Sequence, residues 1–150
     1  IVCHCIRCRE IKGDVFDPDD TELRVFEYEA SEGKEFFISF NDPVRDKLCS
    51  LLRLRFSSYS LQDKPHFIQE LEGAALVREV HTYGAQVRVG RSDDTASQHG
   101  GLGRRMIEKA EEISRAAGFK KVAIIAGVGT RNYYRKWGYE LEGTYMTKKI

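Results

Sequence analysis

A glycine-rich turn that leads into an amphipathic helix constrains this chain more than any other feature. Residues 98–103 have the sequence Gln-His-Gly-Gly-Leu-Gly. At Gly101 and Gly103 the missing Cβ atoms let a ligand approach the backbone, and the first turn of a helix offers free N–H donors and a positive dipole end. The segment therefore predicts an anion site at the start of a helix.

The helix itself is predicted from the spacing of its apolar residues. They recur at steps of three and four, with charged residues on the other faces. The apolar positions are Leu102, Met106, Ala110, Ile113 and Ala117. Gly118 is expected to end the helix.

The surrounding order of elements excludes two other phosphate-binding loops. A Walker loop ends in Gly-Lys-Ser/Thr, and a dinucleotide fold carries its motif near the start of a βαβ unit, and neither condition is met here. The helix is followed instead by an apolar strand at 121–126, a loop at 127–132 and a short segment at 133–139. These features favour the pyrophosphate of a CoA-type cofactor.

The N-terminal half predicts an antiparallel sheet, because apolar and polar residues alternate in several runs bounded by turn residues. Strands are expected at 23–30, 35–40, 48–56, 74–83 and 86–89, with a turn at 31–34, a polar insertion at 57–72 and a turn-rich loop at 90–97. Cys49 is expected to be buried within its strand as a small apolar residue.

Composition indicates one soluble domain, residues 1–150, of α/β or α+β class. The chain is 41% hydrophobic and 31% charged, without a long apolar run or a signal-peptide pattern, so we expect a cytoplasmic protein with no membrane contact. Residues 101–150 hold 11 Lys/Arg against 5 Asp/Glu, whereas residues 1–100 hold 13 against 18. This basic C-terminal half is expected to face CoA phosphates or RNA, or to be a solvated helix face.

Four segments stand together in one order, and they carry a family resemblance. They are Arg-Glu-Val-His-Thr-Tyr-Gly at 78–84, the glycine-rich turn at 98–103, Gly-Val-Gly-Thr-Arg-Asn-Tyr-Tyr-Arg-Lys at 127–136 and Gly-Thr-Tyr-Met at 143–146. With this order the chain resembles the Gcn5-related N-acetyltransferase (GNAT) superfamily. Over nearly its whole length it is similar to the C-terminal acetyltransferase domain of the Elongator catalytic subunit family, of archaeal or bacterial type.

The resemblance implies an α+β fold of GNAT type, with a mostly antiparallel central sheet flanked by helices. It also implies an acyltransferase that uses acetyl-CoA to modify the wobble uridine of tRNA. The full family protein carries an upstream radical S-adenosylmethionine domain with an iron–sulfur cluster. The sequence lacks the corresponding C-x-x-x-C-x-x-C motif and begins at Ile1, so we expect a fragment that works with its own radical domain and contacts tRNA largely through it.

Cofactor contacts follow from the resemblance and from the chemistry of the reaction. Strand backbone groups hold a thioester better than flexible side chains do, and in the superfamily the strand before the phosphate loop bonds the pantetheine arm. The expected cofactor-binding residues are Glu79, Val80, His81, Gln98, Gly101, Leu102, Gly103 and Tyr133.

The departing CoA thiolate needs a proton donor, for which a tyrosine hydroxyl is suited. Tyr134 fits the superfamily position and Tyr133 is equally part of the motif, so both are candidate catalytic residues. Adjacent helical residues point about 100° apart, so one would touch cofactor while the other packs, unless both are core aromatics. Asn132 is either the helix N-cap or a CoA contact.

The acceptor base stays open at this point. Glu70, Glu72, Glu79 and His81 could each deprotonate an acceptor, and no spacing rule selects among them.

Three cysteines near the N-terminus predict a zinc site. Cys3, Cys5 and Cys8 have the spacing C-x-C-x-x-C, which in a reducing compartment suits a tetrahedral metal better than disulfides. A fourth ligand is required, and His66 is our first choice, since His4 is sterically awkward between two ligands. Prokaryotic members of the resembled family carry a zinc site near the junction of their domains. The alternative is three reduced thiols.

Three hypotheses about function follow. The first is an acetyl-CoA-binding domain of a tRNA wobble-uridine modifying enzyme. The second is a lysine N-acetyltransferase with the same cofactor residues. The third is a zinc-bearing RNA-binding module whose phosphate loop no longer binds cofactor.

Overall fold

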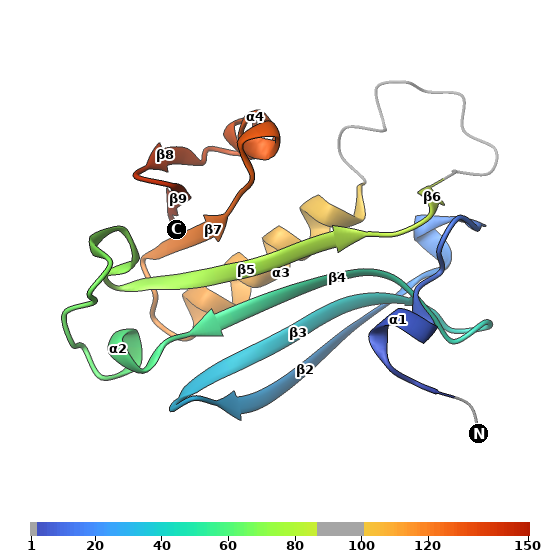
Figure 1. The fold of residues 1–150 in the computed structure, drawn as a ribbon, viewed down its shortest axis with the longest axis horizontal. Coiled ribbons are helices and arrows are strands. Elements are labelled where there is room, and N and C mark those ends of the chain that lie inside the picture. The colour runs from blue at the N-terminus through green and yellow to red at the C-terminus, as the bar shows by residue number, and fades with distance from the viewer. Residues whose placement is uncertain (1–2, 87–100) are drawn as a thin grey trace.

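The structure, a computed structural model, describes residues 3–86 and 101–150. Its main element is a seven-stranded sheet with the strand order β2-β3-β4-β5-β7-β9-β8 (Figure 1). The strands of this sheet are β2 (Glu22–Ala30), β3 (Gly33–Asp42), β4 (Lys47–Phe56), β5 (Ala74–Thr82), β7 (Lys121–Ile125), β8 (Glu140–Glu142) and β9 (Tyr145–Lys149). Two further strands, β1 (Val15–Phe16) and β6 (Ala85–Gln86), form a separate parallel pair.

One long helix accompanies the sheet, and the other helical segments in the described ranges are short. The long one is α3 (Leu102–Ala116). The short ones are α1 (Ile6–Arg9), η1 (Pro18–Asp20), α2 (Ser58–Leu61), η2 (Gln69–Leu71), η4 (Val128–Thr130) and α4 (Arg131–Arg135). None of the helices in the described ranges has the length and apolar character needed to span a bilayer.

The main core lies between α3 and one face of the sheet. Alternate residues of β3, namely Phe36, Ile38 and Phe40, are buried on this face because side chains along a strand point to opposite sides. Met106 and Ala110 bring the apolar stripe of α3 against them. The predicted helix is thus confirmed.

The helix also ends where its sequence predicts. Gly118 follows the last turn with φ +90°, a conformation that favours glycine, and the chain then turns into β7.

A smaller core covers part of the opposite face. Leu71, Ala74 and Ala123 are buried there, with Ile68 and Tyr145 packed against them. The segment predicted as a polar insertion, residues 57–72, thus contributes η2 and an apolar patch to the sheet. The prediction missed this because the apolar residues of the segment show no strand or helix period.

The prediction of a mostly antiparallel sheet is confirmed. Within the seven-stranded sheet, β5 and β7 are the parallel neighbours, and the remaining pairs are antiparallel. The expected turn at 31–34 is the β2–β3 hairpin, where Ser31 and Glu32 have positive φ. Of the expected strand at 86–89, only Gln86 falls within the described residues, where it belongs to β6; the loop at 90–97 falls outside them.

Candidate active site

The strands β5 and β7 pair only along their first halves. Their register runs from Ala74 opposite Lys121 to Val77 opposite Ile124. Beyond Val77, β5 continues to Thr82 while β7 ends and turns away, which opens a fork in the sheet (Figure 1). No strand in the described part of the chain pairs with β5 on the fork side beyond that point. Backbone N–H and C=O groups facing the fork can therefore bond an extended ligand.

The first turn of α3 lies beside this fork. A Cβ atom added to Gly103 would lie 2.7 Å from the Tyr133 hydroxyl oxygen and 3.9 Å from the Thr82 hydroxyl oxygen. The end of β5, the start of α3 and the short helix α4 therefore meet at one place. The sequence placed these residues in three separate motifs, and the fold brings them together.

The helix start also fits an anion. Gly101 is the N-cap residue, with extended backbone angles and no side-chain hydrogen bond to cap the helix. Among the described residues, no atom lies within 4 Å of a Cβ atom added there, and the N–H groups of the first turn have no partner within the helix itself. Leu102 is fully buried, so its side chain is not available to a ligand. Gln98 lies outside the described residues.

The two candidate tyrosines have different surroundings. Tyr134 is 6% exposed and belongs to the main core, where its ring meets those of Trp137 and Tyr139 edge-on. Tyr133 is 41% exposed, and its hydroxyl lies at Gly103. Burial, together with the adjacent Tyr134, raises the pKa of Tyr133 to about 12. The Tyr133 hydroxyl therefore keeps its proton at neutral pH and can donate it.

The three β5 residues predicted to bind cofactor divide by face. Val80 packs against the main core. Glu79 and His81 point to the opposite face, where the Glu79 carboxylate accepts a hydrogen bond from Arg53 Nε at 2.7 Å and lies 3.1 Å from His81 Nε2. Side-chain contacts thus engage all three, and their main chain runs along the fork.

The structure locates the other candidates from the sequence. Glu70 lies against Gly143 in the turn between β8 and β9. Asn132 is not the N-cap of α4, because Thr130 holds that position, and the Asn132 side chain accepts a hydrogen bond from Arg135 at 2.6 Å. The N-cap hypothesis was wrong because the short helix begins at Arg131, two residues earlier than an N-cap at Asn132 would require, after a 3-10 turn.

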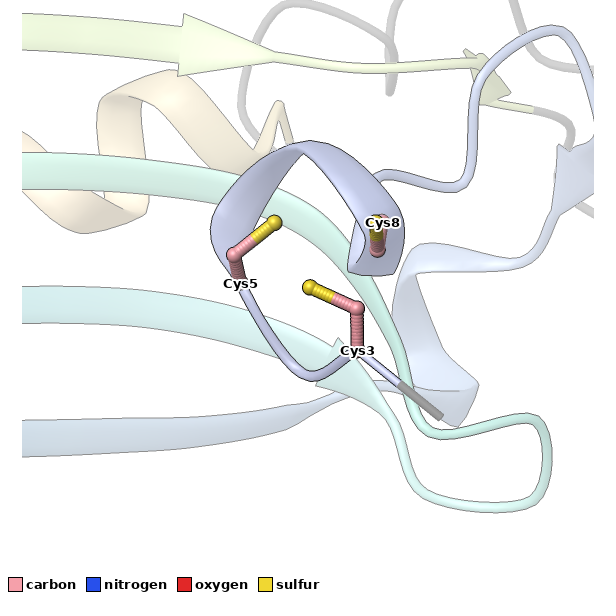
Figure 2. Close-up of side chains that lie close together, drawn as sticks. All are labelled: Cys3, Cys5 and Cys8. Atoms are coloured by element: carbon pink, nitrogen blue, oxygen red, sulfur yellow. The ribbon is translucent and has the colours of Figure 1, made fainter. Parts of the chain in front are cut away.

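The three N-terminal cysteines gather around α1, as Figure 2 shows. Cys3, Cys5 and Cys8 are exposed, and their sulfur atoms all lie within 4.8 Å of one another. Sulfur atoms bound to one zinc ion, each about 2.3 Å from it, would satisfy this spacing. The donor set therefore fits three of the four ligands of a structural zinc.

His66 does not join these cysteines. α1 lies at the beginning of β4, where Lys47 Nζ donates to the Cys8 carbonyl, whereas His66 follows α2 at the far end of the same strand (Figure 1). Ten extended residues separate the two ends, roughly 30 Å. Instead, the His66 ring stacks on Phe67, and its Nδ1 accepts a hydrogen bond from the Ile68 N–H. The hypothesis failed because sequence gives no path for a loop between two elements.

The forked mixed sheet and the long helix that starts after a glycine form an α+β fold, the class that the resemblance to the Gcn5-related N-acetyltransferases implies. No protein-family model matches the chain. Comparison with individual proteins is more specific. The chain is 44% identical to Elongator complex protein 3 of Drosophila melanogaster over 99% of its length, which is 27% of the fly protein. It is 43% identical to the tRNA uridine(34) acetyltransferase of Dehalococcoides mccartyi, covering 99% of this chain and 32% of that protein.

A solved structure agrees with these relatives. Elp3 of the archaeon Methanocaldococcus infernus superposes with a TM-score of 0.77 at 37% identity, covering 99% of this chain and 35% of the archaeal one. Over 99% of its length the chain is thus similar to one part of Elongator complex protein 3 and of tRNA uridine(34) acetyltransferase. It spans about a third or less of the length of these curated relatives.

Proposed function

We propose that this chain binds acetyl-CoA in the fork between β5 and β7 and supplies the acetyl group in the modification of uridine 34 of tRNA. The observation that carries the proposal is the meeting of Thr82, Gly103 and Tyr133 where the fork opens. A thioester needs an extended slot lined by backbone groups, an anion site for its pyrophosphate and a proton donor for its leaving sulfur. The fork, the α3 start and Tyr133 offer one each.

In this proposal the backbone of Glu79, Val80 and His81 bonds the pantetheine arm. The pyrophosphate lies on the N–H groups that follow Gly101, where the helix dipole favours negative charge. Tyr133 donates its proton to the CoA thiolate, and Tyr134 supports it from the core. Gln98 remains a predicted contact.

The acceptor is proposed from the relatives. A tRNA uridine(34) acetyltransferase is among them, and a lysine N-acetyltransferase, our alternative from the sequence, is not favoured by any of the relatives described above. In this proposal S-adenosylmethionine and an iron–sulfur cluster belong to a radical domain in the part of the relatives that this chain does not span. Such an enzyme would work in the cytoplasm on tRNA.

We also propose that Cys3, Cys5 and Cys8 bind zinc, with a fourth ligand other than His66. The sulfur spacing supports this, and three thiolates are soft ligands that zinc prefers. The ion would tie the first residues to the turn of α1.

Acetyl-CoA binding tests the proposal most directly. Calorimetry on the purified protein is expected to show one binding event for acetyl-CoA and for desulfo-CoA. Gly101→Glu should abolish both, because its carboxylate would lie at the helix start and repel phosphate. Gly101→Ala is the matched control and should bind nearly as the wild type does. Equal affinity in the Glu variant would overturn the assignment.

A further inference from the structure

A groove opens on the face of the sheet opposite α3. Its floor includes Glu35, Arg55 and Arg78 from the sheet, and its wall includes Tyr59 and Phe67 from the insertion at 57–72. The groove has a volume of about 700 Å³. This lies within the range of roughly 300–1,000 Å³ that is typical of small-ligand sites. We call it the aromatic groove.

The aromatic groove begins where the fork opens. Arg78 is the first residue of β5 beyond the last β5–β7 register pair, Val77 opposite Ile124. Tyr145, which also lines the groove, pairs with Ile125 at the end of β7. A thioester held in the fork would therefore have α3 on one side and the aromatic groove on the other. An acceptor would reach it from the groove.

A buried carboxylate holds two arginine side chains in place at the groove. The Glu35 side chain is 4% exposed and accepts hydrogen bonds from Arg78 at 2.6 Å, Tyr28 at 2.9 Å and Arg55 at 3.1 Å. Two guanidinium groups face one carboxylate, so the charged lining residues carry a net positive charge. Such a surface attracts a phosphate and repels the ammonium group of a lysine substrate.

An aromatic shelf forms the other wall. The rings of His66 and Phe67 stack with centroids 4.7 Å apart and an interplanar angle of 20°, and Tyr59 meets both. Phe67 is 78% exposed although it is apolar. The Ile68 N–H donates to His66 Nδ1, which leaves the ring proton on Nε2. Proteins bind single-stranded nucleic acid with such a combination, in which the exposed rings stack on the bases and the guanidinium groups contact the phosphates.

We propose that the aromatic groove binds a nucleotide of single-stranded RNA, with its base stacked on Phe67 and its phosphate at Arg78. The inference rests on the proposed function, since it places the RNA on the acceptor side of the fork. Glu35 is a positioning residue that holds Arg78 and Arg55 in place.

Binding of a fluorescent ten-nucleotide oligouridylate to the full-length protein tests the groove. Phe67→Ala should weaken binding about ten-fold by removing one stacking contact, and Phe67→Trp should restore it. Arg78→Gln should weaken binding and lower the salt dependence by about one charge. Val44→Ala, at another exposed apolar residue, and Lys120→Gln, at another exposed cation, are matched controls outside the groove and should bind as the wild type does.

A local measurement separates the groove from other RNA contacts of the full-length protein. Oligonucleotides with 4-thiouridine should crosslink on irradiation to the peptide that contains Tyr59, His66 and Phe67, and Arg78→Gln should reduce this crosslink. Wild-type affinity in both Phe67→Ala and Arg78→Gln, or a lysine peptide that competes as well as RNA, would overturn the proposal. The affinity for acetyl-CoA, measured by calorimetry in the same variants, should stay unchanged. Absence of acetyl-CoA binding in the wild type would instead refute the proposed function.

Discussion

At the scale of single residues, the two tyrosines of α4 are neighbours in sequence but lie in different environments. Tyr134 lies in the main core, whereas the Tyr133 hydroxyl meets the glycine of α3 at the fork. Sequence alone left the pair undivided, because the short helix gives no periodicity from which to choose a face. Only the approach of α3 from a distant part of the chain decides which ring borders the fork.

In the proposed function, Tyr133→Phe is expected to lower kcat for acetyl transfer by about 10²-fold, because the leaving thiolate would lose its proton donor. The KM for acetyl-CoA should change little, since the ring remains. Because the pKa of Tyr133 is raised to about 12, the hydroxyl stays protonated throughout the usual assay range. Steady-state kinetics from pH 6 to 9 check both points, with Tyr134→Phe as the matched control. A larger loss in Tyr134→Phe than in Tyr133→Phe would reverse the roles.

Glu35 is expected to make stability depend on acid. Burial acts to raise the pKa of Glu35, but hydrogen bonds from Tyr28, Arg78 and Arg55 outweigh it, so the pKa lies below its usual value. A lowered folded-state pKa adds stability that is present above the usual carboxyl range, about pH 4, and is lost as pH falls through the folded pKa.

Urea unfolding between pH 2 and 7 checks this dependence. The Glu35→Gln variant should lose less of its free energy of unfolding below pH 4 than the wild type loses. Glu32→Gln, in the exposed β2–β3 turn, is the control and should keep the wild-type slope. Identical slopes in Glu35→Gln and wild type would show that the carboxylate does not act in this way.

At the scale of elements, a buried carboxylate joins α3 to the C-terminal strands. Glu111 is 5% exposed and accepts hydrogen bonds from the Tyr139 hydroxyl at 2.9 Å, from Lys148 at 2.8 Å and from Arg115 at 3.0 Å. Burial and the Glu111 charge both raise the pKa of Tyr139, so its hydroxyl stays a donor. The bonds from Lys148 and Tyr139 attach α3 to β9 and to the chain before β8, and the bond from Arg115 lies within α3.

Glu111→Gln is expected to lower the free energy of unfolding by about 2 kcal/mol, since it removes the charge that pairs with Lys148 and mismatches one donor. For a chain of this size that corresponds to a Tm roughly 6 °C lower. Thermal and urea denaturation measure the change. Glu112→Gln, whose exposed carboxylate pairs with Lys109, should stay within about 0.5 kcal/mol of wild type.

The elements that could be predicted are those whose sequence carries a period. α3 follows from its three- and four-residue spacing, and β3 and β4 follow from their alternation. β1 and β6 are two residues each, and their pairing depends on the rest of the fold. The apolar contribution of Leu71 and Ile68 escaped prediction for the same reason, because it exists only once η2 lies on the sheet.

At the scale of the whole molecule, the proposed zinc site lies at the edge of the fold. Cys3, Cys5 and Cys8 are exposed, and α1 buries no residue. Metal loss should therefore affect the N-terminal segment and leave the cores intact.

The purified protein is expected to hold about one zinc per chain by mass spectrometry of metals. Cys5→Ser should lose most of it, with an unchanged far-ultraviolet spectrum and a Tm within about 2 °C of wild type, because the ligands lie outside both cores. Cys49→Ser is the control for metal content, since Cys49 is buried in β4. Full zinc content in Cys5→Ser would refute the site.

The candidate site as a whole could be predicted in its parts. Motifs named Gly103 and Tyr133, and the resemblance gave their roles, but their contact spans thirty positions and needs the fold. Thr82, which completes the meeting point, carried no signal of its own beyond its place in the 78–84 motif. The prediction of His66 as a zinc ligand was wrong because a proline and a histidine in a polar loop do not show which end of the sheet the loop approaches.

The fork has a mechanical consequence. Only four register pairs, Ala74–Lys121 to Val77–Ile124, join the strands β2 to β5 to the strands β7 to β9. The other contacts that hold the two groups of strands together are made by packing against α3. A cofactor arm bound between β5 and β7 would take the place of the missing half of a strand. It would thereby reduce the movement of the strands β2 to β5 relative to the strands β7 to β9. Those amide hydrogens of residues 78–82 that face the fork rather than β4 would then exchange slowly only while the cofactor is bound, so hydrogen exchange at these positions would report cofactor occupancy.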